Sequence, residues 1–348
     1  MSAQVDVSLD ELQSWVGREH EFAGIDAVTR SDIRRKLEVY CFDCPLHYDE
    51  AVARAHGYRD LVAPGALTPL WAMPAYWRPG EPVPWQPGLR EQAGGIRTDV
   101  PVPSAFQGGV NTATWWEYFE PVYPGDELRG NWRLVEIKPR ETKLGNGVFV
   151  TVEATIFKRS GELVAKNSNT HYRFAPKSAE ARKEKPLEPP PELDADGANA
   201  ARATPADFDW SRQRRFGEVA VGDAVPPFAM WLSYQRVVMS VAVDRMFSGL
   251  HHDRERARWR GFRDVIFNTR GYEMTFEVML RRWIGLDGRI TKLGPFRMTG
   301  SSYPSDVVTV SGRVTGTTDE THRVQVELLA MNDRGEAGRG EAEVSLPP

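Results

Sequence analysis

Residues 41 to 61 contain two groups of side chains that could do chemistry. Cys41 and Cys44 form a Cys-x-x-Cys pair, a spacing that occurs in redox sites and zinc sites. The next residues, from Pro45 to Asp49, place His47 among polar neighbours. Histidine is the side chain that most often transfers protons near neutral pH. The two groups therefore predict different chemistry.

The cysteine pair has little support from the rest of the chain. The sequence holds two cysteines in 348 residues and no His-x₃₋₅-His pair, so a zinc site cannot be completed. A redox pair usually lies near a βαβ pattern, whereas this pair follows a helical pattern and precedes Pro45. Redox chemistry and two small side chains in a tight bend are the alternatives, and the position favours the bend.

The histidine segment occurs twice in the chain. Residues 47–62, HYDEAVARAHGYRDLV, correspond without a gap to residues 251–266, HHDRERARWRGFRDVI, at an offset of 204. Further matches keep the same order: Val16-Gly17 with Val221-Gly222, Tyr123-Pro-Gly-Asp126 with Tyr303-Pro-Ser-Asp306, and Ser160-Gly-Glu162 with Arg334-Gly-Glu336. Similarity that preserves order along the chain indicates a duplicated domain. The offsets shrink from 204 to 174, so the first copy holds about 30 extra residues.

A segment of different composition separates the two copies. Residues 176–206 are rich in proline, alanine and charge and have no apolar period, which is typical of a linker. We therefore predict an N-terminal domain over residues 1–175 and a C-terminal domain over residues 207–348. At roughly 150 residues per domain, the chain length agrees with two domains.

Both copies show the same order of elements. A helix near residues 31–40, or 234–247 in the second copy, is followed by the histidine segment and then by a second helix. Alternating strands follow near residues 112–122, 126–138 and 147–174, and near residues 290–300, 306–317 and 322–346. One buried helix followed by long antiparallel strands predicts an α+β fold. A capping box at Ser8–Glu11 predicts a short helix before the first copy.

Composition and charge argue against several classes of protein. The net charge of −4 gives no basic field for nucleic acid or an anionic membrane. No apolar run approaches the roughly 20 residues of a membrane helix, and the acidic N-terminus is not a signal peptide. We therefore expect a cytoplasmic protein that binds neither nucleic acid nor membrane.

The duplicated segment resembles a known family. D-x-N-P-[LI]-H-x-D-x-x-x-A followed by G-[FY]-x-x-[LVI]-[VI]-x-x-G is the pattern of the MaoC-like, or R-specific hydratase 2, enoyl-CoA hydratases and dehydratases. Phe106-Gln-Gly-Gly109 with Tyr123-Pro-Gly-Asp126 is similar to their fatty-acid-synthase-type N-terminal dehydratase variant. The resemblance implies a tandem (double) hotdog, in which each copy has a central helix wrapped by an antiparallel β-sheet.

The resemblance also implies a reaction. Family members add water reversibly to a trans-2-enoyl thioester, usually an acyl-CoA, and give an (R)-3-hydroxyacyl thioester. An aspartate and a histidine share the catalytic water, and a glycine N–H holds the thioester oxygen. Neither a metal nor a cofactor is implied.

Copy one keeps part of the implied site. His47 matches the family's histidine, and Gly65 matches the oxyanion glycine that binds the substrate. Cys44 stands at the asparagine and Phe42 at the catalytic aspartate, with Asp43 one place later. We therefore expect His47 to be catalytic with Asp43 as its partner. The alternative is a structural His47 bonded to a loop carbonyl.

Copy two departs further from the pattern. His251 matches, but Met246 stands at the aspartate and the nearest acid is Asp244. The family's asparagine, proline and oxyanion glycine positions hold Ser248, Gly249 and Thr269. We expect this copy to close the acyl pocket as a scaffold, with His251 and Asp244 as the alternative site.

Three further features can be interpreted from the sequence. The first is structural, and the other two each have a functional and a structural interpretation. Asp49 and Asp253 are expected to cap short helices over residues 50–56 and 254–260. The arginines of residues 254–260 either meet coenzyme A phosphates or form a solvated helix face. The aromatic and proline-rich insert around Trp71 and Trp85 either lines a wide acyl pocket or covers the sheet.

Three functions remain open at the level of sequence. The first is a hydro-lyase on an enoyl or 3-hydroxyacyl thioester. The second is a hotdog acyl-CoA thioesterase, and the third is a non-catalytic acyl-thioester binder or partner subunit. A duplicated hotdog can satisfy its pairing within one chain, so a homodimer and association with another hotdog subunit are both open.

Overall fold

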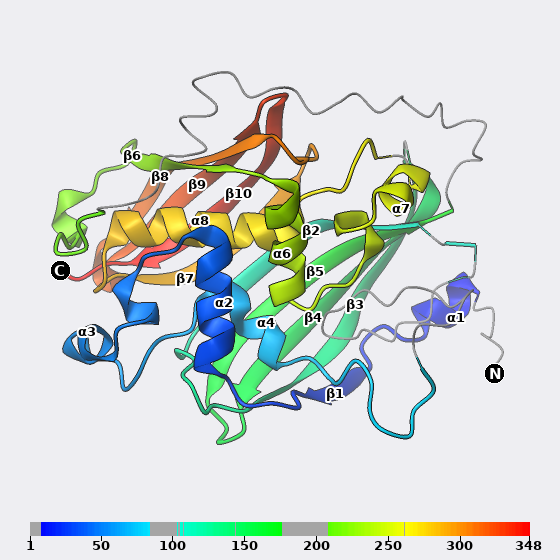
Figure 1. Ribbon diagram of the computed structural model, residues 1–348, viewed down its shortest axis with the longest axis horizontal. Coiled ribbons are helices and arrows are strands. Elements are labelled where there is room, and N and C mark those ends of the chain that lie inside the picture. The colour runs from blue at the N-terminus through cyan, green and yellow to red at the C-terminus, as the bar shows by residue number, and fades with distance from the viewer. Residues whose placement is uncertain are drawn as a thin grey trace.

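A single ten-stranded sheet forms the frame of the molecule (Figure 1). The computed structural model describes residues 8–83, 103, 105–106, 108–142, 144–175, 208–260 and 262–348. The strand order is β1-β3-β4-β5-β2-β7-β10-β9-β8-β6, and neighbouring strands pair antiparallel. The predicted α+β architecture is confirmed.

The two halves of the sheet come from the two sequence copies. The first half contains β1 (Glu19–Ala23), β2 (Gly108–Tyr118), β3 (Leu128–Thr142), β4 (Gly145–Lys158) and β5 (Leu163–Phe174). The second half contains β6 (Ala224–Trp231), β7 (Arg289–Met298), β8 (Val307–Thr318), β9 (Arg323–Asn332) and β10 (Gly335–Ser345). The halves meet where β2 pairs with β7, so the order read outward from this seam is the same on both sides.

The strands were predictable from alternation because one face of the sheet is buried. In β9, Val324, Val326, Leu328 and Ala330 are buried and the residues between them are more exposed. The predicted strand segments coincide with β2 to β5 and β7 to β10 within a few residues. The sequence did not predict the edge strands β1 and β6, which are short or contain consecutive prolines.

The helices lie on one side of the sheet (Figure 1). They are α1 (Leu9–Gln13), α2 (Arg30–Tyr40), α3 (Glu50–Ala55), α4 (Thr68–Trp71), α6 (Tyr234–Val243), α7 (Arg254–Trp259) and α8 (Thr269–Ile284). Asp49 accepts hydrogen bonds from the amides of Ala51 and Val52, and Asp253 accepts one from Arg256, so both predicted caps are confirmed. Helix α2 begins at Arg30, one residue earlier than expected, because Thr29 caps it.

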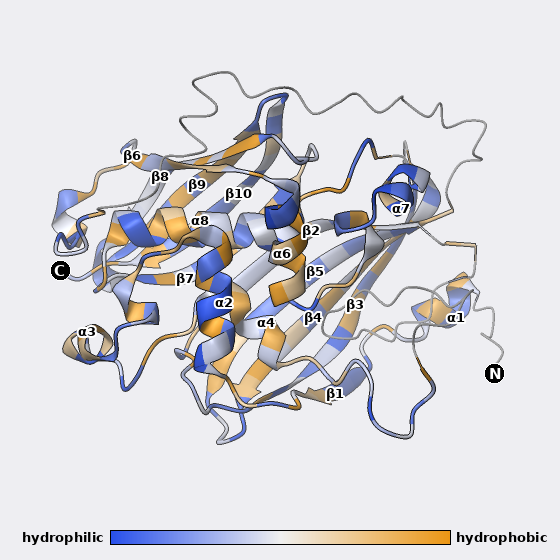
Figure 2. Ribbon diagram, viewed as in Figure 1, coloured by the Kyte–Doolittle hydropathy of each residue, from blue (hydrophilic) through white to orange (hydrophobic). Residues whose placement is uncertain are grey.

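Helix α8 is the central helix of copy two. Asn268 caps it by accepting a hydrogen bond from the Gly271 amide, and almost every α8 side chain is buried. Figure 2 shows hydrophobic segments on α6, on α8 and on strands behind them. Apolar residues all round a helix are typical of a helix enclosed by the rest of the fold.

Copy one has no helix of comparable length among its described residues. At the corresponding place, a short 3₁₀ turn over Gly65–Leu67 leads into α4, which ends at Trp71. Pro69 fits the first turn of α4, but Pro74 lies where a longer helix would need an amide donor. The expected central helix of copy one is therefore much shorter than that of copy two, and α8 packs against this turn.

A buried ion pair joins the copies on the helical side of the sheet. Lys36 of α2 donates to both carboxylate oxygens of Asp244, at 2.6 and 2.7 Å. Asp244 is the residue directly after α6, and neither side chain has solvent-accessible surface. The pair fixes α2 of copy one against α6 of copy two.

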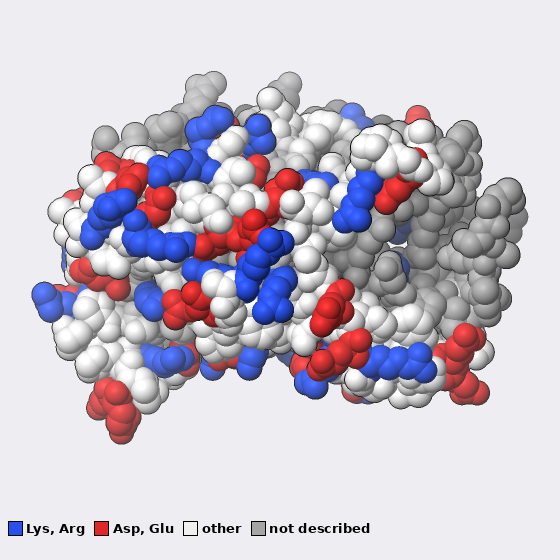
Figure 3. Space-filling view, turned by 90° about the horizontal axis from the view of Figure 1, so that it is seen from below, with Lys and Arg blue, Asp and Glu red and all other residues white. Residues whose placement is uncertain are grey.

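The face of the molecule seen in Figure 3 carries both signs of charge. Lysine and arginine side chains alternate there with aspartate and glutamate, and no large field of one sign forms. Across the described residues, no helix is both long enough and apolar enough to cross a membrane. The predicted linker, residues 176–206, lies outside the described residues.

Candidate active site

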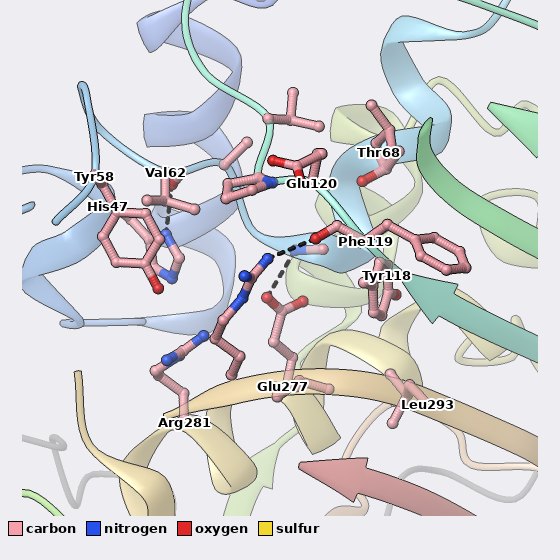
Figure 4. A pocket seen from close by; sticks show the side chains of 17 residues that line it. His47, Tyr58, Val62, Thr68, Tyr118, Phe119, Glu120, Glu277, Arg281 and Leu293 are labelled. Carbon is pink, nitrogen blue, oxygen red and sulfur yellow. Dashed lines mark hydrogen bonds between the residues drawn. The ribbon is translucent and has the colours of Figure 1, made fainter. Parts of the chain in front are cut away.

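Side chains of both copies line one pocket (Figure 4). It holds about 650 Å³ of empty space, part of it open solvent. Copy one contributes His47, Tyr58, Val62, Gly65, Thr68 and Tyr118, and copy two contributes Glu277, Arg281, Arg289, Ile290 and Leu293. The pocket therefore lies at the junction of the copies, and it combines apolar walls with a few polar groups, as ligand sites do.

His47 enters this pocket from a 3₁₀ turn, Pro45–His47, that precedes α3. Its Nδ1 lies 2.6 Å from the carbonyl oxygen of Val62. A carbonyl oxygen can only accept, so Nδ1 carries a proton and donates it. Burial lowers the pKa of His47 to about 3, so the ring is neutral and Nε2 keeps its lone pair. Nε2 is buried and has no hydrogen-bond partner in the part of the chain that the structure describes.

The second copy repeats this geometry. His251 Nδ1 lies 2.8 Å from the carbonyl oxygen of Ile266, and the offset of 204 relates both residues to His47 and Val62. Burial lowers the pKa of His251 to about 4. The hydrogen bond to a loop carbonyl is therefore part of the duplicated scaffold, and it holds each imidazole in one tautomer.

The two predicted aspartates are engaged away from the histidines. Asp43 accepts a hydrogen bond from Arg282 of α8 at 3.0 Å and is not among the residues that line the pocket. Asp244 is held by Lys36 in the buried pair described above. Phe42, at the family's aspartate position, packs its ring against the imidazole of His47, with centroids 4.9 Å apart. An apolar ring therefore occupies the side of His47 from which a carboxylate was expected.

The Gly65 amide already has a partner within the protein. Gly65 N–H donates to Glu277 Oε1 at 2.7 Å, and Ala66 N–H donates to Glu277 Oε2 at 2.8 Å. Both donors open the 3₁₀ turn before α4, where backbone amides point outward and favour an anion. A carboxyl group of copy two thus occupies the donors that the resemblance assigns to the thioester oxygen.

Burial raises the pKa of Glu277 above its usual value, although the two amide bonds and the charge of Arg281 oppose the shift. The Arg281 guanidinium is directed to the end of its own helix, because it donates to the carbonyl oxygens of Gly285 and Gly288. Glu277 is thus a buried acid with a raised pKa in a pocket that also holds a neutral imidazole. Such groups are frequent at functional sites.

Sequence analysis missed Glu277 and Arg281 as site residues. Both lie on the buried helix α8, 212 or more positions from Gly65 along the chain. A signal was present: Glu273, Glu277 and Arg281 recur at four-residue spacing, which places them along one side of a helix whose apolar residues predict burial. Charged residues on an enclosed face need partners or a function.

A family model matches most of the first copy. Residues 14–167 match the dehydratase domain region of the FAS1-like family. A probable enoyl-CoA hydratase alpha subunit of Thermomonospora curvata is 32% identical over 209 residues, which is 59% of this chain and 62% of that protein. The alignment thus covers less than two thirds of that relative's length.

Solved structures match nearly the whole chain. A MaoC-like dehydratase superposes with a TM-score of 0.72 at 20% identity, and the match covers 96% of this chain and 99% of that one. A Mycobacterium tuberculosis protein described as a double hotdog gives a TM-score of 0.61 at 12% identity, covering 96% and 97%. The chain has the double-hotdog fold. Its two sheet halves, joined at β2 and β7, are the two hotdogs.

The cysteine pair of this double-hotdog protein lies outside the pocket. Cys41 ends α2 in the left-handed conformation, with φ of 48°, and Cys44 is buried. Burial raises the pKa of the Cys44 thiol to about 12, so it stays protonated and a poor nucleophile. Both cysteines are free, which agrees with the bend interpretation.

The structure places parts of the two segments for which a substrate contact was one interpretation. Of the insert, Trp71 is buried beneath Asp32, with its indole N–H 3.3 Å from that carboxylate, and Trp77 is exposed. Trp85 lies outside the described residues. On α7, Arg254 pairs with Asp264 at 3.0 Å. None of the described residues of the insert from Trp71 onward or of α7 lines the pocket.

Proposed function

We propose that the protein is a hydro-lyase that adds water to, or removes it from, an enoyl or (R)-3-hydroxyacyl thioester. Coenzyme A is the proposed carrier. The observation that carries the proposal is the neutral His47, which lines a pocket between the two hotdogs, whose Nδ1 is held by Val62 and whose Nε2 has no hydrogen-bond partner among the described residues. A T. curvata relative named as a probable enoyl-CoA hydratase alpha subunit supports this reaction class.

His47 supplies the base of the proposed reaction. The Nε2 lone pair accepts a proton from the water that attacks C3 of the enoyl group, and the Val62 carbonyl stabilises the imidazolium through Nδ1. The apolar walls of the pocket, such as Leu293 and Ile290, give the acyl chain a surface to pack against. In the dehydration direction, the same ring returns the proton to the leaving hydroxyl.

The test is hydration of crotonyl-CoA and of a bulkier enoyl-CoA, followed by loss of the ultraviolet band of the conjugated thioester. His47→Ala is expected to lower kcat by roughly 10²–10⁴-fold, which is the usual contribution of general acid–base catalysis. His251→Ala is the matched variant in the second copy, and it is expected to keep the rate. Loss in His251→Ala with unchanged turnover in His47→Ala would place the site in copy two, with Asp244 as its acid.

The same assay separates the second enzyme class. A carboxyl group beside the pocket, Glu277, is also what an acyl-CoA thioesterase needs to activate water at the carbonyl carbon. Release of free thiol, detected with Ellman's reagent, would identify a thioesterase. Loss of the ultraviolet band without thiol release identifies hydration. Binding without either signal would indicate an acyl-thioester binder, or a subunit that needs another hotdog partner.

The predicted role of Asp43 is a separate proposal with its own variant. Asp43 would have to leave Arg282 to reach the water at His47. If it is the partner of His47, Asp43→Asn loses a rate factor of the same order as His47→Ala. An unchanged kcat in Asp43→Asn would assign this carboxylate to the ion pair alone.

A further inference from the structure

We infer that Glu277, supplied by the central helix of the second hotdog, is the catalytic acid that works with His47 of the first hotdog. This assignment rests on the proposed hydro-lyase activity and names its second catalytic residue. Both side chains line the same pocket, although 230 positions separate them in the chain. The active site is then shared between the two copies.

The other acids near the copy-one histidine are unsuited to this role. Asp43 is bound to Arg282 and lies outside the pocket lining. Glu120 lines the pocket but its side chain is exposed, so bulk water competes for any proton it would transfer. Glu277 combines burial with access to the pocket.

The hydrogen bonds of Glu277 leave its proton available. Each carboxyl oxygen accepts one backbone N–H, from Gly65 or Ala66, and a carboxyl oxygen has room for more than one partner. A protonated Glu277 keeps both amide bonds and can point its O–H into the pocket. When that proton leaves, the two amides stabilise the carboxylate that forms. Gly65 is then a positioning residue, because it acts through Glu277.

The chemical step balances with these two groups. His47 Nε2 takes a proton from water, the water oxygen bonds to C3, and the C2–C3 π pair moves toward the thioester carbonyl. C2 then takes the Glu277 proton. One imidazolium and one carboxylate remain, and transfer of the proton between them through a water molecule restores both groups. In dehydration the Glu277 carboxylate removes the C2 proton.

The charged and titratable groups around Glu277 come from four elements. Arg281 lies one turn along α8, Lys36 approaches from α2, Tyr118 from β2, and His47 lines the same pocket from its 3₁₀ turn. The two cations favour the carboxylate, whereas burial favours the acid and dominates. Loss of hydration activity is therefore expected as the pH rises through the raised pKa of Glu277, because the acid form delivers the proton.

The pseudo-symmetry of the chain explains why one site has this acid and the other does not. The offset of 204 that relates Gly65 to Thr269 also relates Met73 to Glu277. In copy one, the residue that corresponds to Glu277 is therefore a methionine, Met73, and it lies beyond the end of the short helix α4. Copy two thus places a carboxyl group in the pocket of His47, whereas the equivalent position of copy one has no carboxyl group to place near His251.

The experiment compares two glutamates of α8. Glu277→Gln is expected to lower kcat for crotonyl-CoA hydration by roughly 10²-fold or more with little change in KM. It should also remove the high-pH limb of the kcat profile. Glu273→Gln is the matched control, because Glu273 is buried one turn earlier, bonds Trp116 and is not a pocket residue. It is expected to keep both the rate and the profile.

Each outcome has one interpretation. Glu277→Asp, which keeps a carboxyl group, should recover part of the rate, and thermal melting shows whether each variant folds. A wild-type rate and an unchanged profile in Glu277→Gln overturn the assignment while the hydro-lyase stands. Equal losses in Glu277→Gln and Glu273→Gln also overturn it, because they indicate a structural effect. A wild-type protein that is inactive on every enoyl thioester overturns the proposed function, and this assignment with it.

Discussion

At the scale of single residues, the two scaffold histidines have the same chemistry in different surroundings. His47 and His251 each donate Nδ1–H to a loop carbonyl, and burial lowers both pKa values. His47 and Glu277 line one pocket, whereas Asp244, the acid that the sequence offered as a partner for His251, is paired with Lys36. The duplication therefore repeats the hydrogen bond to the loop carbonyl, whereas the residues around the two histidines differ.

The depressed pKa of His251 predicts a pH dependence of stability. The unfolded histidine, with a pKa near 6.5, binds a proton below that pH, whereas the folded one stays neutral down to about pH 4. Stability from His251 is thus fully present above pH 6.5 and is lost as the pH falls toward 4. The free energy of unfolding, measured with urea at several pH values in this window, should depend less steeply on pH in His251→Gln than in the wild type. The expected difference is up to about 1.4 kcal/mol per pH unit. If the unfolding free energies of wild type and variant change with pH in parallel, the lowered pKa of His251 is contradicted.

At the scale of elements, helix α8 fixes the site. Its N-terminus is set by Asn268, whose side chain accepts the Gly271 amide at 2.8 Å, and its third turn presents Glu277 to the Gly65 turn. The short α4 of copy one leaves the pocket side of this turn open to α8. The two copies therefore differ most in the element that a hotdog places at its centre.

The cap of α8 can be tested by itself. Asn268→Ala is expected to lower the free energy of unfolding by about 1–2 kcal/mol, because the Gly271 amide at a buried helix end loses its acceptor. Asn268→Ser keeps an oxygen at the cap and should recover most of the loss. Chemical denaturation measures both variants. Equal stabilities of the alanine and serine variants would mean that the cap bond contributes little.

At the scale of the whole molecule, the contacts that join the copies include the β2–β7 seam and the buried Lys36–Asp244 pair. Removal of one charge leaves the other buried without a partner, which typically costs about 3–5 kcal/mol. Lys36→Met should therefore destabilise the protein strongly. Arg34→Met on the same helix breaks the exposed pair with Glu38 and should have little effect.

The double variant completes this test. Lys36→Met combined with Asp244→Leu removes both charges, and it should be markedly more stable than Lys36→Met alone. Thermal and urea unfolding measure the set. If the double variant is as unstable as the single one, the loss comes from packing of the α2–α6 contact and not from the unpaired charge.

The sequence by itself determined much of this protein. Strand positions followed from alternation, because a sheet with one buried face repeats every two residues. The repeat located His47 and His251 and the caps Asp49 and Asp253, because these bonds are made within about 15 residues along the chain. The α+β fold followed from local patterns and their order, and the double hotdog followed from the family resemblance of the duplicated segment.

Tertiary structure decided which acidic side chains share the pocket with His47. Sequence proximity favoured Asp43, but Arg282 of α8 lies where it can bind that carboxylate, and Phe42 covers the imidazole. Glu277 reaches the Gly65 turn because α8 is long, α4 is short, and the seam sets them side by side. The contact between Gly65 and Glu277 spans 212 residues and depends on how the two folded copies pack. The periodicity of either copy alone therefore cannot predict it.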